Sequence, residues 1–443
     1  MWLRRDLRLA DNPAWVEAAA EGDCVAAFVI DPVLWDASGP IRRAYLTASL
    51  RALDASIGGR LLVRHGDPAA VIPALATEVG AASVHIAADF GPYGSARDLA
   101  VEQALGAVPL VRTGSPYAVA PGRVRKDDGT PYRVFTPFSK AWLRHGWRAP
   151  ADPVDPSAVI TAGARSDGIP TVDDTGGIAV PPAGEDAAWE RWAAFHAGAL
   201  RDYADLRNRP DLDGTSAMSH HLKYGEVHPR SLLAELDDDD QTFRLELCWR
   251  EFYADVLTQR PDSVTTSLDA RYDEQMRWSD GPAADAAFEA WTHGRTGYPF
   301  VDAGMRQLRE TGWMHNRVRM VVASFLVKDL HLPWQRGAHH FMHLLRDGDI
   351  ASNTHGWQWT AGCGTDAAPF YRVFNPVLQG EKFDPDGDYV RRWIPELRHL
   401  AGKKVHAPWD VADGYAHGYP ARIVDHSVER DVALADHKAL SRT

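Results

Sequence analysis

The chain has 443 residues, of which 45% are hydrophobic and 24% charged, and its formal net charge is −12. These values are ordinary for globular proteins and exclude disordered, collagen-like and fibrous chains. The sequence contains no run of 18 apolar residues, so it predicts no membrane span. The negative charge is concentrated in residues 151–300, which hold 13 basic and 28 acidic groups, so a basic surface elsewhere is compatible with the total.

The three cysteines, Cys24, Cys248 and Cys363, are far apart in the sequence and form no C-x-x-C motif. This spacing argues against a disulfide framework and against a zinc site, so we predict no metal centre. Residues 4–6 are already charged, so the start of the sequence lacks the apolar stretch of a secretory signal. We therefore expect a reduced, cytoplasmic protein.

The first part of the chain alternates short apolar segments with amphipathic ones. The expected strands are one that ends at Leu3 and four over residues 25–31, 60–64, 83–87 and 108–112. The expected helices lie near residues 12–21, 41–57, 69–79 and 94–105. This alternation predicts a doubly wound, parallel five-stranded sheet of Rossmann-like type over residues 1–125. No G-x-G-x-x-G motif follows the first strand, so the usual dinucleotide fingerprint is absent.

Composition changes in the middle of the chain. Residues 151–184 contain five prolines and five glycines, which indicates an irregular segment, and we expect an interdomain linker over residues 126–190. Residues 191–443 show helical periodicity and no convincing strand, which predicts an all-α domain. Thr215 and Ser216 are expected to cap a helix. Longer helices are expected at residues 242–258, 300–312, 314–330 and 337–346.

One predicted helix carries an unusual face. Glu246, Trp249, Arg250 and Tyr253 follow each other at i, i+3, i+4 and i+7 and therefore share one side of the helix. A face directed at the core would consist mainly of Leu, Ile and Val. The alternative to a functional face is a partly exposed, salt-bridged surface with two amphipathic rings.

Two further segments could carry chemistry. Asn316 and Met320 are helical neighbours at i and i+4, while Arg317 and Arg319 are expected to point elsewhere; the alternative is an asparagine in an ordinary helix contact. Trp357 and Trp359, if helical, lie about 200° apart around the helix, so one ring can face a cavity while the other faces the protein interior.

Taken together, these segments resemble the photolyase/cryptochrome family over nearly the whole chain, and most of all the class I photolyases that act on cyclobutane pyrimidine dimers. The motifs that carry the resemblance lie at residues 4–12, 213–216, 249–252, 296–299, 312–320, 347–359, 364–369 and 374–376. The resemblance implies an N-terminal α/β domain, a helical domain that binds FAD and DNA, and a light-driven carbon–carbon lyase. Excited FADH− would donate one electron to the dimer, whose ring splits before the electron returns.

The resemblance also implies a flavin site. Hydroxyls and free helix amides suit a pyrophosphate. The family's cofactor positions match Tyr203, Thr215, Ser216, Ala217, Met218, Ser219, Arg319, Asp347, Asp349 and Asn353. Arg319 would pair with Asp347. Asn353 matches the residue that faces flavin N5, and asparagine there is similar to photolyases that work with reduced FAD.

The resemblance also implies a pocket for the DNA lesion. Trp249 and Trp359 match tryptophans that line the pocket for a flipped dimer, and Glu246 matches the carboxylate that binds the thymine edge and stabilises the dimer radical anion. Asn316 and Met320 match further pocket residues. The competing interpretations are a blue-light cryptochrome without repair activity and a photolyase for (6-4) lesions, whose members depart from this sequence at several of these positions.

The resemblance also implies an electron-transfer chain and a set of DNA contacts. Trp357, Trp334 and Trp278 match a chain that photoreduces oxidised FAD. The expected contacts to UV-damaged DNA are Arg207, Arg250, Tyr253, Arg317, Arg372 and Gln379. Such cations would form the local positive surface that an acidic protein needs for DNA, which we expect it to bind as a monomer.

An antenna chromophore is the last expectation. Residues 88–94 follow the fourth strand, at the sheet edge where doubly wound folds bind ligands. Asp89 resembles the acid that contacts 8-hydroxy-5-deazaflavin, and Lys223 the lysine that reaches its phenolate-like oxygen, so this chromophore is favoured over methenyltetrahydrofolate. A cation beside that oxygen favours its ionised form. The alternative is that Asp89 caps the next helix and Lys223 is a surface charge.

Overall fold

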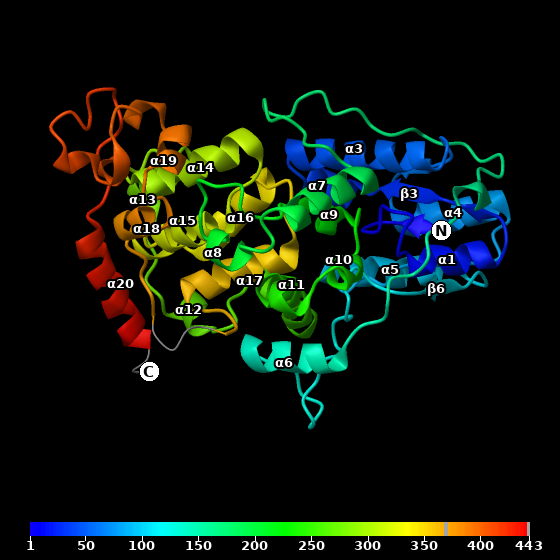
Figure 1. Ribbon diagram of the computed structural model, residues 1–443. Helices are drawn as coiled ribbons and strands as arrows, with labels where there is room; N and C mark the ends of the chain where they lie inside the picture. Colours follow the sequence, from blue (N-terminus) through cyan, green and yellow to red (C-terminus); the bar gives the residue numbers. More distant parts are fainter. Residues whose placement is uncertain (367–370, 441–443) are drawn as a thin grey trace. The chain divides into compact units, whose positions relative to one another are not determined.

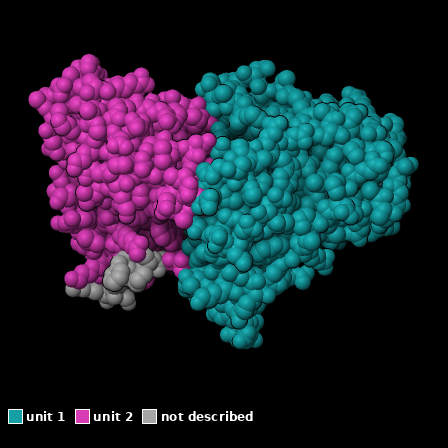
Figure 2. Space-filling model, viewed as in Figure 1, with its two compact units in different colours: residues 1–201, 216–261, 346–351 teal, residues 202–215, 262–345, 352–443 magenta. Residues whose placement is uncertain are grey.

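The computed structural model describes residues 1–366 and 371–440, so Ala367, Ala368 and Pro369 of one family motif lie outside the described residues. The chain divides into two compact units, which Figure 2 distinguishes by colour. Unit 1 comprises residues 1–201, 216–261 and 346–351. Unit 2 comprises residues 202–215, 262–345 and 352–443.

All strand pairs of unit 1 are parallel. Strand β3 (Ala27–Ile30) pairs with β1 (Trp2–Leu3) on one side and with β4 (Leu62–His65) on the other. Strand β5 (Val84–Ile86) pairs with β6 (Leu110–Arg112) and lies beside β1, which gives the order β4-β3-β1-β5-β6. The predicted α/β class and parallel direction are confirmed, although the hydrogen-bonded ladder is divided into a three-stranded and a two-stranded part.

Four of the five helices between these strands begin where the sequence predicts them, and α2 is a short additional helix that the sequence analysis did not predict. They are α1 (Pro13–Ala20), α2 (Pro32–Asp36), α3 (Pro40–Ser56), α4 (Pro68–Val79) and α5 (Pro92–Leu105), seen in blue and cyan in Figure 1. Each has proline at its first position, where the missing N–H costs no hydrogen bond. The side chain of Asn12 accepts the backbone N–H of Trp15, and α4 ends at Gly80 with φ of 62°.

The proline- and glycine-rich segment is less irregular than expected. It contains strand β7 (Val159–Ile160), which pairs in parallel with β2 (Cys24–Val25). The remaining helices of unit 1 are α6 (Phe135–His145), α7 (Glu185–Ala197), α9 (Ser219–Tyr224), α10 (Pro229–Ala234) and α11 (Gln241–Gln259). Helix α6 packs on α11, and Figure 1 shows the two as neighbours.

The predicted helix cap at Thr215 and Ser216 is wrong. The helix that follows, α9, begins at Ser219 and is preceded by Met218. The backbone of Ala217 has φ of 52°, a left-handed conformation that interrupts any helix there. The Ser216 hydroxyl accepts the N–H of Met218 at 3.3 Å instead, so it stabilises a turn ahead of the helix.

The regular elements among the described residues of unit 2 are all helices. Its helices are α8 (Tyr203–Leu206), α12 (Arg271–Glu274), α13 (Gly281–Thr292), α14 (Pro299–Thr311), α15 (Asn316–Lys328), α16 (Trp334–Leu344), α18 (Pro376–Phe383), α19 (Asp388–Trp393) and α20 (His426–Leu440). Helix α17 (Ile350–Ala361) begins in the part of the chain assigned to unit 1 and continues into unit 2. Helix α14 is central, because α13, α15, α18 and α19 all pack on it.

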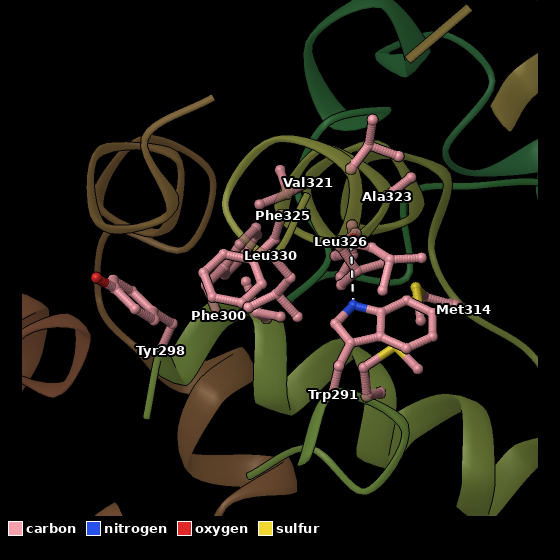
Figure 3. Close-up of a cluster of buried hydrophobic side chains, with 14 of the residues drawn as sticks. Trp291, Tyr298, Phe300, Met314, Val321, Ala323, Phe325, Leu326 and Leu330 are labelled. Atoms are coloured by element: carbon pink, nitrogen blue, oxygen red, sulfur yellow. Dashed lines mark hydrogen bonds between the residues drawn. The ribbon is translucent and has the colours of Figure 1, made fainter. Parts of the chain in front are cut away.

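The core of unit 2 is built from large apolar side chains of these helices. Trp291 and Met314 lie beneath Leu326 in Figure 3, and the indole N–H of Trp291 donates to the backbone oxygen of Val322 at 3.1 Å. A buried indole with a satisfied N–H adds a large apolar surface without an unpaired donor. Among the described residues, no helix combines the length and apolar character needed to cross a lipid bilayer.

Candidate functional site

Helix α11 presents the predicted face of Glu246, Trp249, Arg250 and Tyr253. All four side chains are partly buried, whereas the opposite side of the helix, which carries Leu247, Cys248, Glu251, Phe252 and Asp255, is buried. The four predicted residues therefore lie together on one accessible side of the helix. This arrangement excludes a core-facing stripe and agrees with a functional face as well as with the partly exposed surface that was the alternative.

The ring of Trp249 is held by stacking. Its indole lies parallel to the ring of Phe135 on α6, with centroids 3.6 Å apart and an angle of 7° between the planes. Phe252 meets it edge-on at 5.7 Å, and Tyr253 is tilted against it at 5.3 Å. Because Phe135 covers one face of the indole, the opposite face is the one on which a base could stack. Sequence reasoning missed Phe135.

A buried carboxylate fixes α11 to the neighbouring chain. Glu251 accepts the backbone N–H groups of Ala118 and, at 3.0 Å, Val119, and it accepts the indole N–H of Trp142 at 2.6 Å. Burial raises the pKa of Glu251 to about 7, against the effect of these donors. One side chain thus ties α11 to α6 and to residues 118–119, and so orients the face that carries Trp249.

Arg250, an expected DNA contact, is already engaged within unit 1. Its guanidinium donates to the backbone oxygens of Pro116 at 2.9 Å and Leu222 at 3.3 Å, and it lies 4.7 Å from the ring centroid of Tyr117. These contacts hold the side chain along the protein surface. Its phosphate contact stays a prediction.

Helix α15 brings Asn316, Arg317 and Met320 together. The side chain of His315 caps the helix by accepting the N–H of Arg317 at 3.1 Å, and Asn316 is exposed at the first position. The expectation that Arg317 points away from this group is wrong, because its guanidinium donates to the sulfur of Met320 at 3.4 Å. Residues i and i+3 are neighbours on a helix surface, so the long side chain of Arg317 can reach Met320 one turn further along the helix.

Arg317 also reaches another segment of unit 2. Its guanidinium donates twice to the side-chain oxygen of Asn208, at 2.7 and 3.0 Å, and lies over the ring of Phe383 at 4.7 Å. Arg207, the neighbour of Asn208, lies 5.7 Å from the ring centroid of Tyr203. Two expected DNA contacts, Arg207 and Arg317, therefore lie on adjoining segments.

The expected flavin residues of unit 1 are Ser216, Ala217, Met218, Ser219, Asp347 and Asp349. The Ser219 hydroxyl donates to the carboxylate of Asp347 at 2.6 Å, so the start of α9 and the segment before α17 lie side by side. Asp349 forms an ion pair with Arg5 at 2.8 Å. Hydroxyl groups such as that of Ser219 can donate to phosphate oxygens, while carboxylates such as those of Asp347 and Asp349 can accept hydrogen bonds from ribose hydroxyls or ring N–H groups.

The expected flavin residues of unit 2 are Tyr203, Thr215, Arg319 and Asn353. Arg319 donates to the backbone oxygen of Met314 at 2.7 Å, and its pairing with Asp347 stays a prediction. The side-chain amide of Asn353 donates to the backbone oxygen of Ala338 at 3.0 Å, which fixes the amide so that its oxygen is the acceptor. Reduced flavin carries a hydrogen on N5, and an acceptor is the polarity that this N–H requires. The residues therefore fit FAD.

The expected electron-transfer chain consists of three tryptophans of unit 2. Trp357 and Trp334 are buried, while Trp278 is partly exposed and donates to the backbone oxygen of Tyr272 at 3.2 Å. The ring of Trp357 lies against Gly337, where a Cβ would come within 2.1 Å of it. Gly337 follows Trp334 by three residues and shares its side of α16, so the two buried indoles lie near each other.

Trp359 lies two residues beyond Trp357 on α17. Trp357 is 3% exposed, whereas Trp359 is partly exposed. The predicted division of the two rings between the interior and an accessible side is confirmed by this difference. Trp359 can therefore offer a ring surface to a base, and Trp357 cannot.

Asp89 and Lys223 lie around a cationic cluster in unit 1. Asp89 accepts the N–H of Gly91 at 3.0 Å and pairs with Arg97 at 3.4 Å, so it stabilises the turn before α5 but does not cap the helix as the alternative interpretation expected. Burial opposes ionisation of Asp89, but Arg5, Arg97 and a further arginine lower its pKa. Lys223 is partly buried, and burial together with Arg5 lowers its pKa to about 7, which is not the behaviour of a surface charge.

The last two expected DNA contacts lie in consecutive segments of unit 2. Arg372 is exposed, and Gln379 is partly buried on α18. Over residues 1–366 and 371–440, no group of three or more His, Cys, Asp or Glu side chains is arranged to hold a metal ion.

Comparison with known proteins gives a consistent result. The family model described as DNA photolyase matches residues 1–157, and that described as the FAD binding domain of DNA photolyase matches residues 243–439. A deoxyribodipyrimidine photo-lyase of Halobacterium salinarum is 39% identical, over 98% of this chain and 97% of the relative.

Two solved structures add a structural comparison. A bacterial class III photolyase from Agrobacterium tumefaciens has a TM-score of 0.91 and 38% identity, with 100% of this chain and 97% of that chain covered. A Synechocystis cryptochrome has a TM-score of 0.88 and 28% identity, with 98% and 97% covered. The photolyase is thus more similar than the cryptochrome in sequence and in fold.

Proposed function

The chain belongs to the DNA photolyase family, and we propose that it is a deoxyribodipyrimidine photo-lyase that repairs cyclobutane pyrimidine dimers in DNA with light and reduced FAD. The observation that carries this proposal is the accessible face of α11, where Trp249 has one ring face covered by Phe135 and lies beside Glu246 and Tyr253. Such a face can stack on an extruded base and offer a carboxyl group to its edge.

The protein groups have distinct roles in this proposal. When bound, reduced FAD supplies the light-driven electron that opens the dimer and accepts it back. Asn353 would accept the N5–H of the reduced ring, and Asp347 and Ser219 would hold other parts of the cofactor. Trp249 and Trp359 would each offer a ring face on which the dimer stacks. Because stacking rings exclude water from the dimer, charge on it interacts more strongly with nearby protein groups.

Glu246 is expected to act on charge that develops during the reaction. Its carboxyl group would hydrogen-bond the base edge and stabilise the added charge, so Glu246→Ala should keep FAD content and dimer affinity but lower repair per absorbed photon several-fold. The measurement is restored pyrimidine per photon, with chemically reduced protein under saturating dimer DNA.

Glu235→Ala is the matched control, because Glu235 is an exposed carboxylate of the same unit. It should repair as wild type does. Equal repair per photon in Glu246→Ala and wild type would remove Glu246 from the mechanism.

The antenna proposal rests on Lys223 and Asp89. A partly buried ammonium whose pKa is lowered to about 7 would be stabilised in its charged form by an anionic neighbour, which the ionised 8-hydroxy-5-deazaflavin would supply. We therefore expect this chromophore to bind in unit 1 with its absorption shifted to longer wavelength, and Lys223→Met to lose the shift.

Reconstitution with each chromophore tests this choice. The deazaflavin should bind and transfer energy to FAD, while methenyltetrahydrofolate should bind more weakly. Tight folate binding without deazaflavin binding would reverse the choice, and indifference to both would mean that Asp89 and Lys223 serve the fold alone.

A further inference from the structure

Lys328 is a buried lysine whose role the resemblance does not assign. It is the last residue of α15 and is 3% exposed. Its ammonium donates to the backbone oxygen of Arg372 at 2.5 Å. Lysine is rarely buried without a carboxylate partner, and the described structure has no ion pair for this one. The contact with Arg372 is therefore the feature that needs explanation.

The same ammonium lies over an aromatic ring. Its nitrogen is 4.2 Å from the ring centroid of Tyr371, and the imidazole of His437 is stacked on that ring at 4.2 Å and 6°. Two groups at this distance cannot occupy the same side, so Lys328 and His437 take opposite faces of Tyr371. The hydroxyl of Tyr272 lies 2.9 Å from the imidazole and fixes it in turn.

Two further contacts continue along the chain. The N–H of Phe374 donates to the hydroxyl of Ser324 at 3.4 Å, and Asn375 caps α18 by accepting N–H groups at 3.0 and 3.1 Å. Ser324 and Lys328 are i and i+4 on α15, so one side of that helix fastens residues 372–374. The backbone of Arg372 is thereby held inward, while its side chain is exposed.

Burying the charged Lys328 ammonium costs desolvation free energy. Burial lowers the pKa of Lys328 to about 7, with Cys363 and Asp329 acting in the opposite direction. An apolar side chain of similar size would fill the space without that cost but would leave the Arg372 oxygen without its donor. The contribution specific to the ammonium is the fixed direction of the Arg372 backbone.

We propose that Lys328 is a positioning residue for DNA binding: by holding the backbone of Arg372 it presents the Arg372 guanidinium to a phosphate of the DNA. This inference rests on the proposed function and deepens it, because Arg372 is an expected DNA contact and Lys328 is not. Residues 371–375 lead directly into α18, whose first turn is capped separately by the Asn375 side chain.

The test is a double-mutant cycle on the FAD-loaded protein, with binding to a dimer-containing duplex measured across a salt series. Lys328→Met should raise Kd by roughly three- to tenfold and reduce the salt slope by about one phosphate contact, as Arg372→Ala should. The double variant should bind no more weakly than Arg372→Ala, because Lys328 acts through Arg372.

Lys403→Met is the matched control, since it removes one exposed lysine from unit 2 and should leave Kd almost unchanged. FAD content and thermal unfolding separate a local effect from lost folding. If Lys328→Met does not load FAD, Lys328→Gln, which keeps a neutral donor, takes its place in the cycle with a smaller expected loss.

Additive losses in the double variant, or an unchanged salt slope in the folded lysine variant, would overturn the inference. Either result could occur while the wild-type protein binds and repairs dimers, which would leave the proposed function intact. Wild-type protein that fails to distinguish dimer DNA from undamaged DNA would instead count against the proposed function itself.

Discussion

Trp357→Phe should lose nearly all photoreduction of oxidised FAD, while repair by chemically reduced protein survives. An indole that gives up an electron is replaced by a benzyl ring that is much harder to oxidise, so the first hop of the chain is removed. The measurement is the rate at which oxidised FAD is bleached under blue light with an external reductant.

The packing of Trp357 makes the prediction specific. Its ring contacts Phe341 at 5.0 Å and lies against Gly337, one helical turn from Trp334. Phenylalanine fits the space that the larger indole leaves, so the core should tolerate the exchange with a modest loss of stability. The loss should therefore appear in photoreduction and not in FAD content.

Trp393→Phe is the matched control, because Trp393 packs against the same core and is not part of the expected chain. It should photoreduce as wild type does. If Trp357→Phe loses photoreduction and repair together, Trp357 serves the structure of the site; if it loses neither, electrons reach FAD by another path.

Trp249→Ala should weaken binding of dimer-containing DNA by about 5- to 150-fold, since stacking contributes roughly 1–3 kcal/mol per base. Binding to undamaged DNA should change little, because an intact duplex keeps its bases stacked. The measurement is the ratio of the two Kd values at fixed salt.

Phe135 provides a second variant for the same site. Phe135→Leu removes the parallel ring at 3.6 Å and leaves Trp249 in place, so it should lower dimer affinity less than Trp249→Ala does. Trp249→Phe should retain part of the affinity. Dimer affinity that is unaltered in Trp249→Ala would mean that the lesion binds elsewhere.

Local sequence was enough to predict much of the fold. Helices α1, α3, α4 and α5 begin within two residues of expectation, because a proline marks each start within the segment itself, preceded by Asn12 in α1 and Asp67 in α4. The cap expected at Thr215 and Ser216 failed, because the left-handed backbone of Ala217 is a property of the folded turn and alanine gives no sign of it.

Tertiary contacts explain what could not be predicted at the site. The α11 face was visible as i, i+3, i+4 and i+7 spacing, but the Phe135 ring that covers Trp249 comes from a helix more than a hundred residues earlier. The hydrogen bond from Arg317 to Met320 depends on the side-chain conformation of Arg317, which the spacing of residues in the sequence does not determine. The contact between Lys328 and Arg372 joins residues with no shared periodicity.

The most direct test of the account is repair itself. Chemically reduced, FAD-loaded protein is mixed with an oligonucleotide that contains one cyclobutane thymine dimer, and blue light is applied with a dark sample alongside. We expect intact thymines to appear in the illuminated sample only, and none from an oligonucleotide with a (6-4) lesion. Tight, light-independent binding without restored thymines, or repair of the (6-4) lesion alone, would contradict the proposed function.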